Sequence, residues 1–336
     1  MTNSYKLFIG ADEAGYGPNL GPLIVAGTVW RVPASLSERA FGEALSSTFG
    51  PRPLPTDLSR IPLGDSKRLY KPKSSLKNLE AGLWALLPSA ECGEFEAFVN
   101  RFVEIHGDLL PWYDTAQSQK CPIAITPVQA LELCERASQC LEQQDIRMLG
   151  VRAVAITEQQ FNNEVERSGS KGQLLSDTTL RLVSQLQSEH QGDGDLLSNM
   201  PCEIFCDRQG GRRNYLPVLQ AAMPDSWFQP QAVATEEGAE PSHRPTDRIS
   251  YYDAASRTRI HFTIGGDSFP PAGLASMLAK YVREQFMLGY NEFWSKQVSG
   301  LKPTAGYPQD ARRFRDEVAS EVARLGVAAT DWWRCK

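Results

Sequence analysis

Residues 9–23 read Ile-Gly-Ala-Asp-Glu-Ala-Gly-Tyr-Gly-Pro-Asn-Leu-Gly-Pro-Leu, and this stretch decides how the start of the chain folds. Two adjacent acids, Asp12 and Glu13, end a short apolar run, and a glycine-rich turn leads into a second apolar run from Leu23 to Trp30. Apolar runs that flank a Gly/Pro turn predict a β-hairpin. Because glycine lets the backbone approach a ligand closely, the two carboxylates are expected beside a loop where a metal and a phosphate-bearing substrate could bind.

The composition is that of a globular protein. The 336 residues include 41% hydrophobic and 22% charged residues, which allows a sizeable buried core. No run approaches the ~20 apolar residues that a membrane span needs, and the first residues lack a signal-peptide pattern. The seven cysteines are an odd number without zinc-ribbon spacing, which favours reduced thiols. We therefore expect a cytoplasmic protein with no membrane partner, and we favour a monomer.

The net charge of -5 is not that of a protein that coats nucleic acid. The positive charges are nevertheless clustered, and affinity for phosphate depends on the local field more than on the total charge. The clusters are Arg208, Arg212 and Arg213 after Asp207, Lys280 and Arg283 after Asp267, and Arg312, Arg313 and Arg315.

Two further acids end strand-like runs. Asp207 follows Ile204-Phe205-Cys206, and Asp267 follows Phe262-Thr263-Ile264 and two glycines. With Asp12 and Glu13 they would form a set of hard oxygen ligands of the kind that Mg²⁺ or Mn²⁺ prefers. A lone acid at a strand end is more often a turn or cap residue, so each of them alone also fits that role. Glu13 faces the same way as Asp12 only if the strand twists there, because neighbouring strand residues point to opposite faces.

Candidate phosphate contacts lie on two other segments. A helix is expected after Pro270 and Pro271, and its Ser276, Lys280 and Arg283 fall at i, i+4 and i+7, on one face. A hydroxyl and two cations in line suit a nucleic-acid backbone, although a solvated helix surface would show the same pattern. Lys67, beside Asp65 and Ser66, fits either a phosphate contact or a polar turn.

Several other chemistries are excluded by spacing. The glycines at 15, 17 and 21 miss the Gly-x-Gly-x-x-Gly spacing of dinucleotide-binding loops, and no Walker lysine is present. No Gly-x-Ser-x-Gly nucleophile elbow occurs. The four histidines are scattered, which argues against a histidine-based zinc site.

The ordered set of motifs resembles the ribonuclease HII family. The pieces that carry the resemblance are the Asp-Glu pair with its Gly-x-Gly loop, Gly64-Asp65-Ser66-Lys67, Glu203-Ile204-Phe205-Cys206-Asp207, Gly266-Asp267 with the helix at 273–283, and Gly306-Tyr307-Pro308. The resemblance implies an α/β, ribonuclease H-like fold: a mixed central sheet flanked by helices, with a helical C-terminal extension.

The family resemblance also implies a function. It implies Mg²⁺- or Mn²⁺-dependent endonucleolytic cleavage of the RNA strand in RNA–DNA hybrids, or at ribonucleotides embedded in duplex DNA, leaving 5′-phosphate and 3′-hydroxyl ends. Its metal ligands and catalytic acids would be Asp12, Glu13, Asp207 and Asp267, and its nucleic-acid contacts Gly15, Tyr16, Gly17, Lys67, Ser276, Lys280 and Arg283.

The chain also departs from the family pattern. Tyr16 stands where the family usually has arginine, and Arg208 stands where it usually has glycine after the third acid. We expect a catalytic domain at residues 1–288 with a helical insertion at roughly 70–150 and a loop insertion at roughly 225–260, followed by a helical extension at 289–336. Residues 75–150 look largely helical, the stretch near 174–188 is amphipathic, and polar loops are expected at 190–200 and 235–248. Apolar residues near helical spacing are Leu131, Leu133, Cys134, Ala137 and Leu141 in the insertion and Phe314, Val318, Val322 and Leu325 in the extension. A non-catalytic nucleic-acid-binding or scaffold protein, and a nuclease for structured DNA, are the alternative functions.

Overall fold

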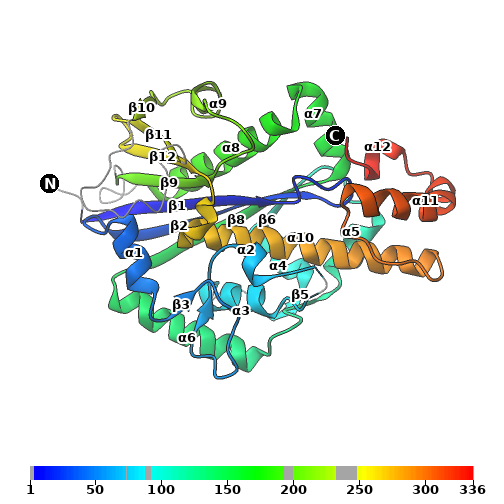
Figure 1. Ribbon diagram of the computed structural model, residues 1–336, viewed down its shortest axis with the longest axis horizontal. Helices are drawn as coiled ribbons and strands as arrows, with labels where there is room; N and C mark the ends of the chain where they lie inside the picture. Colours follow the sequence, from blue (N-terminus) through cyan, green and yellow to red (C-terminus); the bar gives the residue numbers. More distant parts are fainter. Residues whose placement is uncertain (1–3, 73, 88–91, 192–199, 232–247, 336) are drawn as a thin grey trace.

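The structure, a computed structural model, describes residues 4–72, 74–87, 92–191, 200–231 and 248–335. Within these residues one eight-stranded sheet forms the centre of the protein (Figure 1). Its strands, in spatial order, are β10 (Gln229–Gln231), β11 (Arg248–Asp253), β12 (Thr258–Thr263), β9 (Cys202–Asp207), β1 (Tyr5–Ala14), β2 (Leu23–Pro33), β8 (Arg147–Ile156) and β6 (Val103–His106).

The sheet is mixed. Strands β1 and β2 form the antiparallel hairpin that the sequence predicts, with Asp12 opposite Ala26. Strand β1 runs parallel to β9, and β9 runs parallel to β12. The carboxyl ends of these three strands therefore meet at one edge of the sheet, and Asp12 and Asp207 lie near those ends.

Alternate residues of the central strands enter two different cores. Phe8, Ile24 and Phe205 belong to one core, and Ile9, Val25 and Ile204 to the other. The first core is covered by α10 (Pro270–Gln297) together with α3 (Lys77–Leu86), α4 (Phe95–Phe102), α5 (Pro111–Gln117) and α6 (Pro127–Gln143). The second is covered by α8 (Lys171–Gln191), α7 (Glu158–Ser168) and α9 (Leu216–Ala222) (Figure 1). The predicted fold class, a mixed sheet with flanking helices, is confirmed.

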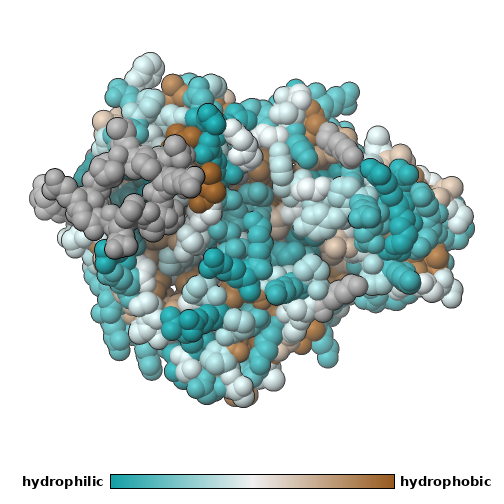
Figure 2. Space-filling model, in the orientation of Figure 1, coloured by the Kyte–Doolittle hydropathy of each residue, from teal (hydrophilic) through white to brown (hydrophobic). Residues whose placement is uncertain are grey.

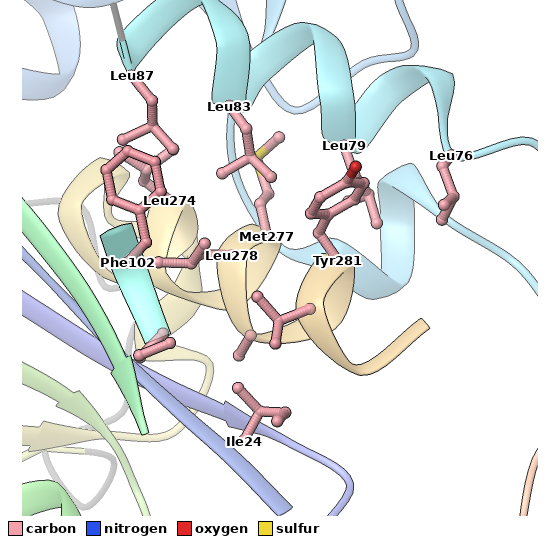
Figure 3. Close-up of a cluster of buried hydrophobic side chains, with 14 of the residues drawn as sticks. Ile24, Leu76, Leu79, Leu83, Leu87, Phe102, Leu274, Met277, Leu278 and Tyr281 are labelled. Carbon is pink, nitrogen blue, oxygen red and sulfur yellow. The ribbon is translucent and has the colours of Figure 1, made fainter. Parts of the chain in front are cut away.

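Helix α10 is the central helix of the first core. Figure 3 shows Leu79 and Leu83 of α3 beside Met277 and Tyr281 of α10, which in turn lies over the strand that carries Ile24. The segment 75–150, predicted to be largely helical, contains α3 to α6. Within α6 the expected buried side is only partly correct, because Leu133 is buried and Leu131 is 66% exposed.

The predicted helical extension is also present. Helix α11 (Pro308–Leu325) turns Phe314, Val318 and Val322 inward, as their spacing predicts, and α12 (Ala329–Trp332) follows it. Figure 2 shows hydrophilic residues gathered over α11. The remaining short elements are α1 (Glu38–Leu45), α2 (Ser66–Leu69), the 3₁₀ turn η1 (Gly266–Ser268), β3 (Phe49–Gly50), β4 (Ile61–Pro62), β5 (Gly93–Glu94) and β7 (Lys120–Cys121).

One segment differs from its prediction. The span 225–260, expected as a loop insertion, contains β10, β11 and the start of β12, so it extends the edge of the sheet. The six residues of β11 do not alternate regularly between buried and exposed positions, so the strand does not stand out beside the polar residues before it. Residues 192–199 and 232–247, which make up most of the polar loops expected at 190–200 and 235–248, lie outside the described residues. No helix among the described residues has the length and apolar character to cross a membrane.

Candidate metal centre and its loop

Two glycines let α10 approach the sheet closely at its first turns. A side chain on Gly10 of β1 would lie 2.1 Å from the backbone of Pro271, and one on Gly273 would lie 2.8 Å from Gly64. Only glycine therefore permits these two contacts. They bring Ser276, on the second turn of α10, beside β1 and beside the 64–67 segment.

The four predicted acids are brought to one place by this packing. Asp12 lies on the α10 side of β1, Asp207 ends β9, and Asp267 lies in η1 between β12 and α10. Asp12 and Asp267 are each 7% exposed. Asp207 accepts a hydrogen bond from the backbone N–H of Gly266 (3.1 Å), which ties the end of β9 to η1.

Mutual repulsion and burial dominate the electrostatics of these acids. Burial, then the charges of Glu13, Asp207 and Asp267, raise the pKa of Asp12 well above its ordinary value, against a hydrogen bond from Ser276 that lowers it. Burial and Asp207 likewise raise the pKa of Glu13. Burial, followed by Asp65 and Asp207, raises the pKa of Asp267 to about 6.

Glu13 does lie beside Asp12. A hydrogen-bonding contact between the two carboxyl groups lowers the pKa of Glu13, and Lys67 lowers it too. The alternation of strand residues made this placement uncertain from the sequence. It arises where β1 reaches its end at Ala14 and the chain enters the Gly15 turn, whose φ is +87°.

Asp65 is a fifth carboxylate that the sequence analysis left without a role. It caps α2 by accepting a hydrogen bond from the N–H of Lys67 (2.8 Å), and its contact with Asp267 raises the pKa of that acid. Its position directly before Ser66 and Lys67 was the available signal. Lys67 is exposed; burial lowers its pKa, but Asp12, Asp267 and Asp65 raise it by more.

The face of α10 that was predicted to bind phosphate is mostly buried. Ser276 is 2% exposed, and its Oγ lies 2.9 Å from Ser66 Oγ, so it supports the acidic site from within. Arg283 is 1% exposed and donates to the carbonyl oxygens of Leu20 and Ala305, which leaves its guanidinium buried away from any phosphate. The prediction of a direct phosphate contact by Arg283 was therefore wrong.

Lys280 keeps partial exposure on that helix. Its ammonium binds Glu284 at 2.6 Å, with side-chain exposures of 18% and 17% for the two residues. It also lies over the ring of Tyr70, 5.0 Å from its centre. The helical periodicity was correct, but α10 is covered on almost every side, because α3 and α5 pack on it as well as the sheet.

The glycine-rich loop lies next to the acids. The ring of Tyr16 packs against the second core, and the Lys171 ammonium lies 4.9 Å from its centre. Gly17 is exposed, and a side chain placed there would lie 4.0 Å from the half-exposed ring of Tyr307. The loop and the Gly-Tyr-Pro turn, 290 residues apart along the chain, are therefore neighbours.

The residues present fit a hard divalent cation. Carboxylates that repel one another and whose pKa values are raised gain most from a cation between them. No three of these acids have oxygens all within 4.8 Å of one another, so a cation here would be held by one or two of the carboxylates at a time.

A second cluster of possible metal ligands does meet the 4.8 Å distance. Among the described residues, ligand atoms of Glu38, Glu203 and His261 all lie within 4.8 Å of one another. Lys6 already binds Glu203 at 2.8 Å, and Arg248 binds both oxygens of Glu38 at 2.7 and 2.8 Å. The cations of the chain itself therefore balance both carboxylates.

Sequence comparison gives no relatives: no family model and no curated protein sequence matches this chain. Comparison with solved structures finds ribonucleases H at low similarity. RNase HII from Archaeoglobus fulgidus, in complex with PCNA, is 13% identical, with 98% of this chain and 94% of that chain covered and a TM-score of 0.39. Ribonuclease H2 from Pyrococcus horikoshii is 13% identical, with 97% and 92% covered and a TM-score of 0.39. Bst-RNase HIII in complex with Mn²⁺ is 14% identical, with 98% and 65% covered and a TM-score of 0.38.

Proposed function

We propose that this protein is a metal-dependent endonuclease that cleaves the RNA strand of RNA–DNA hybrids or at ribonucleotides embedded in duplex DNA. One observation carries the proposal: four acids from three separate parts of the chain meet as one electrostatically coupled group beside an open glycine loop. Acids that serve only as turn or cap residues have no reason to gather where their charges repel one another.

Asp12, Asp207 and Asp267, with Glu13, would hold Mg²⁺ or Mn²⁺. Such ions, when bound in pairs, activate a water and stabilise the leaving oxygen of a phosphodiester. The chain orients its own ligands: Ser276 bonds Asp12, and the Gly266 N–H bonds Asp207. These contacts would help to orient the two carboxylates toward a bound cation.

Substrate binding would use the exposed groups around the acids. Lys67 offers a cation beside Asp12 and Asp267, and it would neutralise a non-bridging phosphate oxygen. Gly17, which is exposed, would let the nucleic-acid backbone come close to the loop beside Gly15 and Tyr16, and Lys280 lies farther along α10. The free cysteines among the described residues fit the reducing conditions of a cytoplasm.

The test is a binding and cleavage assay on four labelled substrates: an RNA–DNA hybrid, a DNA duplex with one ribonucleotide, the same duplex without it, and a branched DNA. We expect cutting of the first two with Mg²⁺ or Mn²⁺, 5′-phosphate and 3′-hydroxyl ends, and no cutting with EDTA. Asp12→Asn is the active-site control, and Glu203→Gln removes a carboxylate from the balanced cluster instead. Cleavage of branched DNA alone, or binding without cleavage in the presence of either metal, would contradict the proposal and favour one of the two alternatives.

A further inference from the structure

A buried group of charges lies behind the Gly15–Gly21 loop, apart from the acidic site. Arg334 and Arg283 are each 1% exposed, and Glu158 is 0% exposed. Charged groups are rarely buried this deeply unless their hydrogen bonds are satisfied. The partners of these three side chains therefore indicate what the burial achieves.

Arg334 binds the loop through its backbone oxygens. Its Nη1 donates to the carbonyl oxygens of Gly15 (2.5 Å) and Gly21 (3.3 Å), and its Nη2 donates to that of Tyr16 (3.2 Å). The guanidinium also stacks over the ring of Phe161 at 3.9 Å. One planar side chain thus joins the two ends of the loop, which a guanidinium can do because its donors form a rigid fork.

Glu158 and Arg283 hold the same loop from other sides. Glu158 Oε1 accepts the N–H of Gly21 (2.9 Å), and its Oε2 accepts the hydroxyl of Tyr113 (2.7 Å). Arg283 donates to the carbonyl of Leu20 at 3.2 Å. Gly15 and Gly21 have φ angles of +87° and +78°, so the loop takes a conformation that side chains disfavour and that these buried charges stabilise.

The segment that carries Arg334 is itself fastened to the loop and to α7. The backbone of Arg334 donates to the carbonyl of Asn19 (2.8 Å), and the Asn19 side chain donates back to the carbonyl of Arg334 (3.0 Å). Asn162 of α7 binds the carbonyl oxygens of Thr330 and Trp333 at 2.7 and 2.8 Å. Figure 1 shows α12 beside α7, at the same end of the sheet as the loop.

We propose that Arg334 is a positioning residue that holds the Gly15–Gly21 loop, and through it Glu13, in the geometry of the acidic site. Buried charges are a weak source of stability, since apolar residues of similar volume often stabilise a core equally well. Three bonds to the carbonyls of one loop instead fix a conformation. The inference rests on the proposed function for its catalytic consequence alone; its structural part stands independently.

The test compares hydrogen exchange in wild type and in Arg334→Met, in the full chain. The reporters are three backbone amides that are bonded in the structure, those of Asn19 and Leu20 to Gly306 and that of Gly21 to Glu158. We expect these amides to exchange at least about 10-fold faster in the variant, as the loss of charge-assisted hydrogen bonds implies. Amides in the middle of β1 and β2 should stay within about two-fold of wild type, because their ladder is unchanged.

Two controls keep the result specific. Arg101→Met makes the same chemical change at an exposed site on α4 and should alter nothing. Val318→Ala lowers stability from the buried side of α11 without touching the loop. Unchanged exchange at residues 19–21 in Arg334→Met, or equal acceleration in Val318→Ala, would overturn the proposal, as would full protection in Arg334→Lys, whose single ammonium cannot span both ends of the loop.

The catalytic readout is separate. If the protein cleaves hybrids, Arg334→Met should raise KM and lower kcat, because both Glu13 and the loop backbone would be displaced, and Arg334→Lys should fall between it and wild type. A variant with faster exchange but unchanged kcat and KM would overturn the positioning role. If wild type cleaves nothing, the proposed function fails, while the exchange measurement still decides whether Arg334 holds the loop.

Discussion

Two clusters of carboxylates in this protein differ in their charge balance: Glu38 and Glu203 beside His261, and the acids around Asp12 and Asp267. At Glu203 the neighbouring His261 and Lys6 lower the pKa to about 2 despite burial, and Arg248 binds Glu38 in a two-point contact. At Asp267 burial and two further acids raise the pKa to about 6, and Lys67 is the nearby cation that lowers it. In the first cluster nearby cations balance the negative charges, whereas the second cluster carries excess negative charge.

This difference teaches that close spacing of ligand atoms is a poor guide to a metal site. Glu38, Glu203 and His261 meet the distance requirement, yet a metal there would have to displace a lysine and an arginine. The acids around Asp12 are spread more widely, and a divalent cation would relieve their repulsion. Carboxylates bind a metal cation most favourably where no lysine or arginine of the chain already balances their charge.

The largest expected effect is on cleavage. Asp207→Asn should lower the metal-dependent rate by more than about 100-fold, since even groups that only orient a ligand cost 10–100-fold when lost. The fold should be retained, because one acid is removed from a group in which acids repel. The measurement is the single-turnover rate with saturating Mn²⁺, with circular dichroism to check folding. Glu203→Gln, the matched change in the balanced cluster, should keep a rate near that of wild type.

A rate for Asp207→Asn within a few-fold of wild type would remove the acid from the metal site. Equal losses in Asp207→Asn and Glu203→Gln would instead indicate that both clusters act through stability.

The second effect is on metal affinity. Mn²⁺ at 100 times its dissociation constant should stabilise the wild-type protein by ~2.7 kcal/mol, measured as a rise in Tm. Asp12→Asn should abolish most of this rise because it removes a ligand that Ser276 orients, and Glu203→Gln should leave it intact. The reverse pattern would place the ion at Glu38, Glu203 and His261 and would break the comparison.

The third effect is on stability against pH, in metal-free buffer. Asp267 has a folded pKa of about 6 against 3.8 when unfolded, so the native state binds more protons between these values and stability falls as pH rises through them. Glu203 has a folded pKa of about 2 against 4.5, so its contribution is present above pH 4.5 and is lost as pH falls toward 2.

Single substitutions separate the two limbs of that profile. Asp267→Asn should flatten the fall between pH 4 and 6, and Glu203→Gln should flatten the acid limb below 4.5, both read from Tm at fixed ionic strength. Identical profiles for the two variants would show that the clusters do not differ in charge balance.

Much of the fold was predictable from the sequence because it depends on local pattern. The hairpin of β1 and β2, the apolar strand β9 and the helices α8, α10 and α11 follow from periodicity and turn residues that act over a few positions. Strand β11 was missed because its six residues sit next to a polar stretch. The exposure of Leu131 depends on how α6 packs on α3, which periodicity does not specify.

The sequence indicated which acids to consider and not which residues support them. The order of the motifs singled out Asp12, Glu13, Asp207 and Asp267, whose role as metal ligands stays a prediction, and their proximity depends on contacts between β1, β9, η1 and α10. Arg283 and Arg334 look like surface cations in the sequence, and only the packed structure shows that they bind loop carbonyls. Long-range partners of this kind leave no periodic signal.

The smallest expected effect concerns Tyr16, where the chain departs from the family pattern. A tyrosine there offers a ring and a hydroxyl, whereas an arginine would offer a two-point contact to a phosphate. We expect Tyr16→Arg to change the ratio of rates on an embedded ribonucleotide and on a hybrid by a few-fold, in favour of the former. Tyr16→Phe, which keeps the ring in its place on the second core, should leave the ratio unchanged.

The surroundings of Tyr16 limit this effect and supply its sharpest control. Lys171 lies 4.9 Å from the ring. Burial and then Glu13 raise the pKa of the Tyr16 hydroxyl, and the charge of Arg212 opposes that rise, so a new guanidinium would meet like charges. The pair Tyr16→Arg with Lys171→Met should therefore show a larger change in the ratio than Tyr16→Arg alone. If both variants keep the wild-type ratio, the ring serves packing alone, and the substrate preference is set by other residues beside the acids, with Lys67 the first to test.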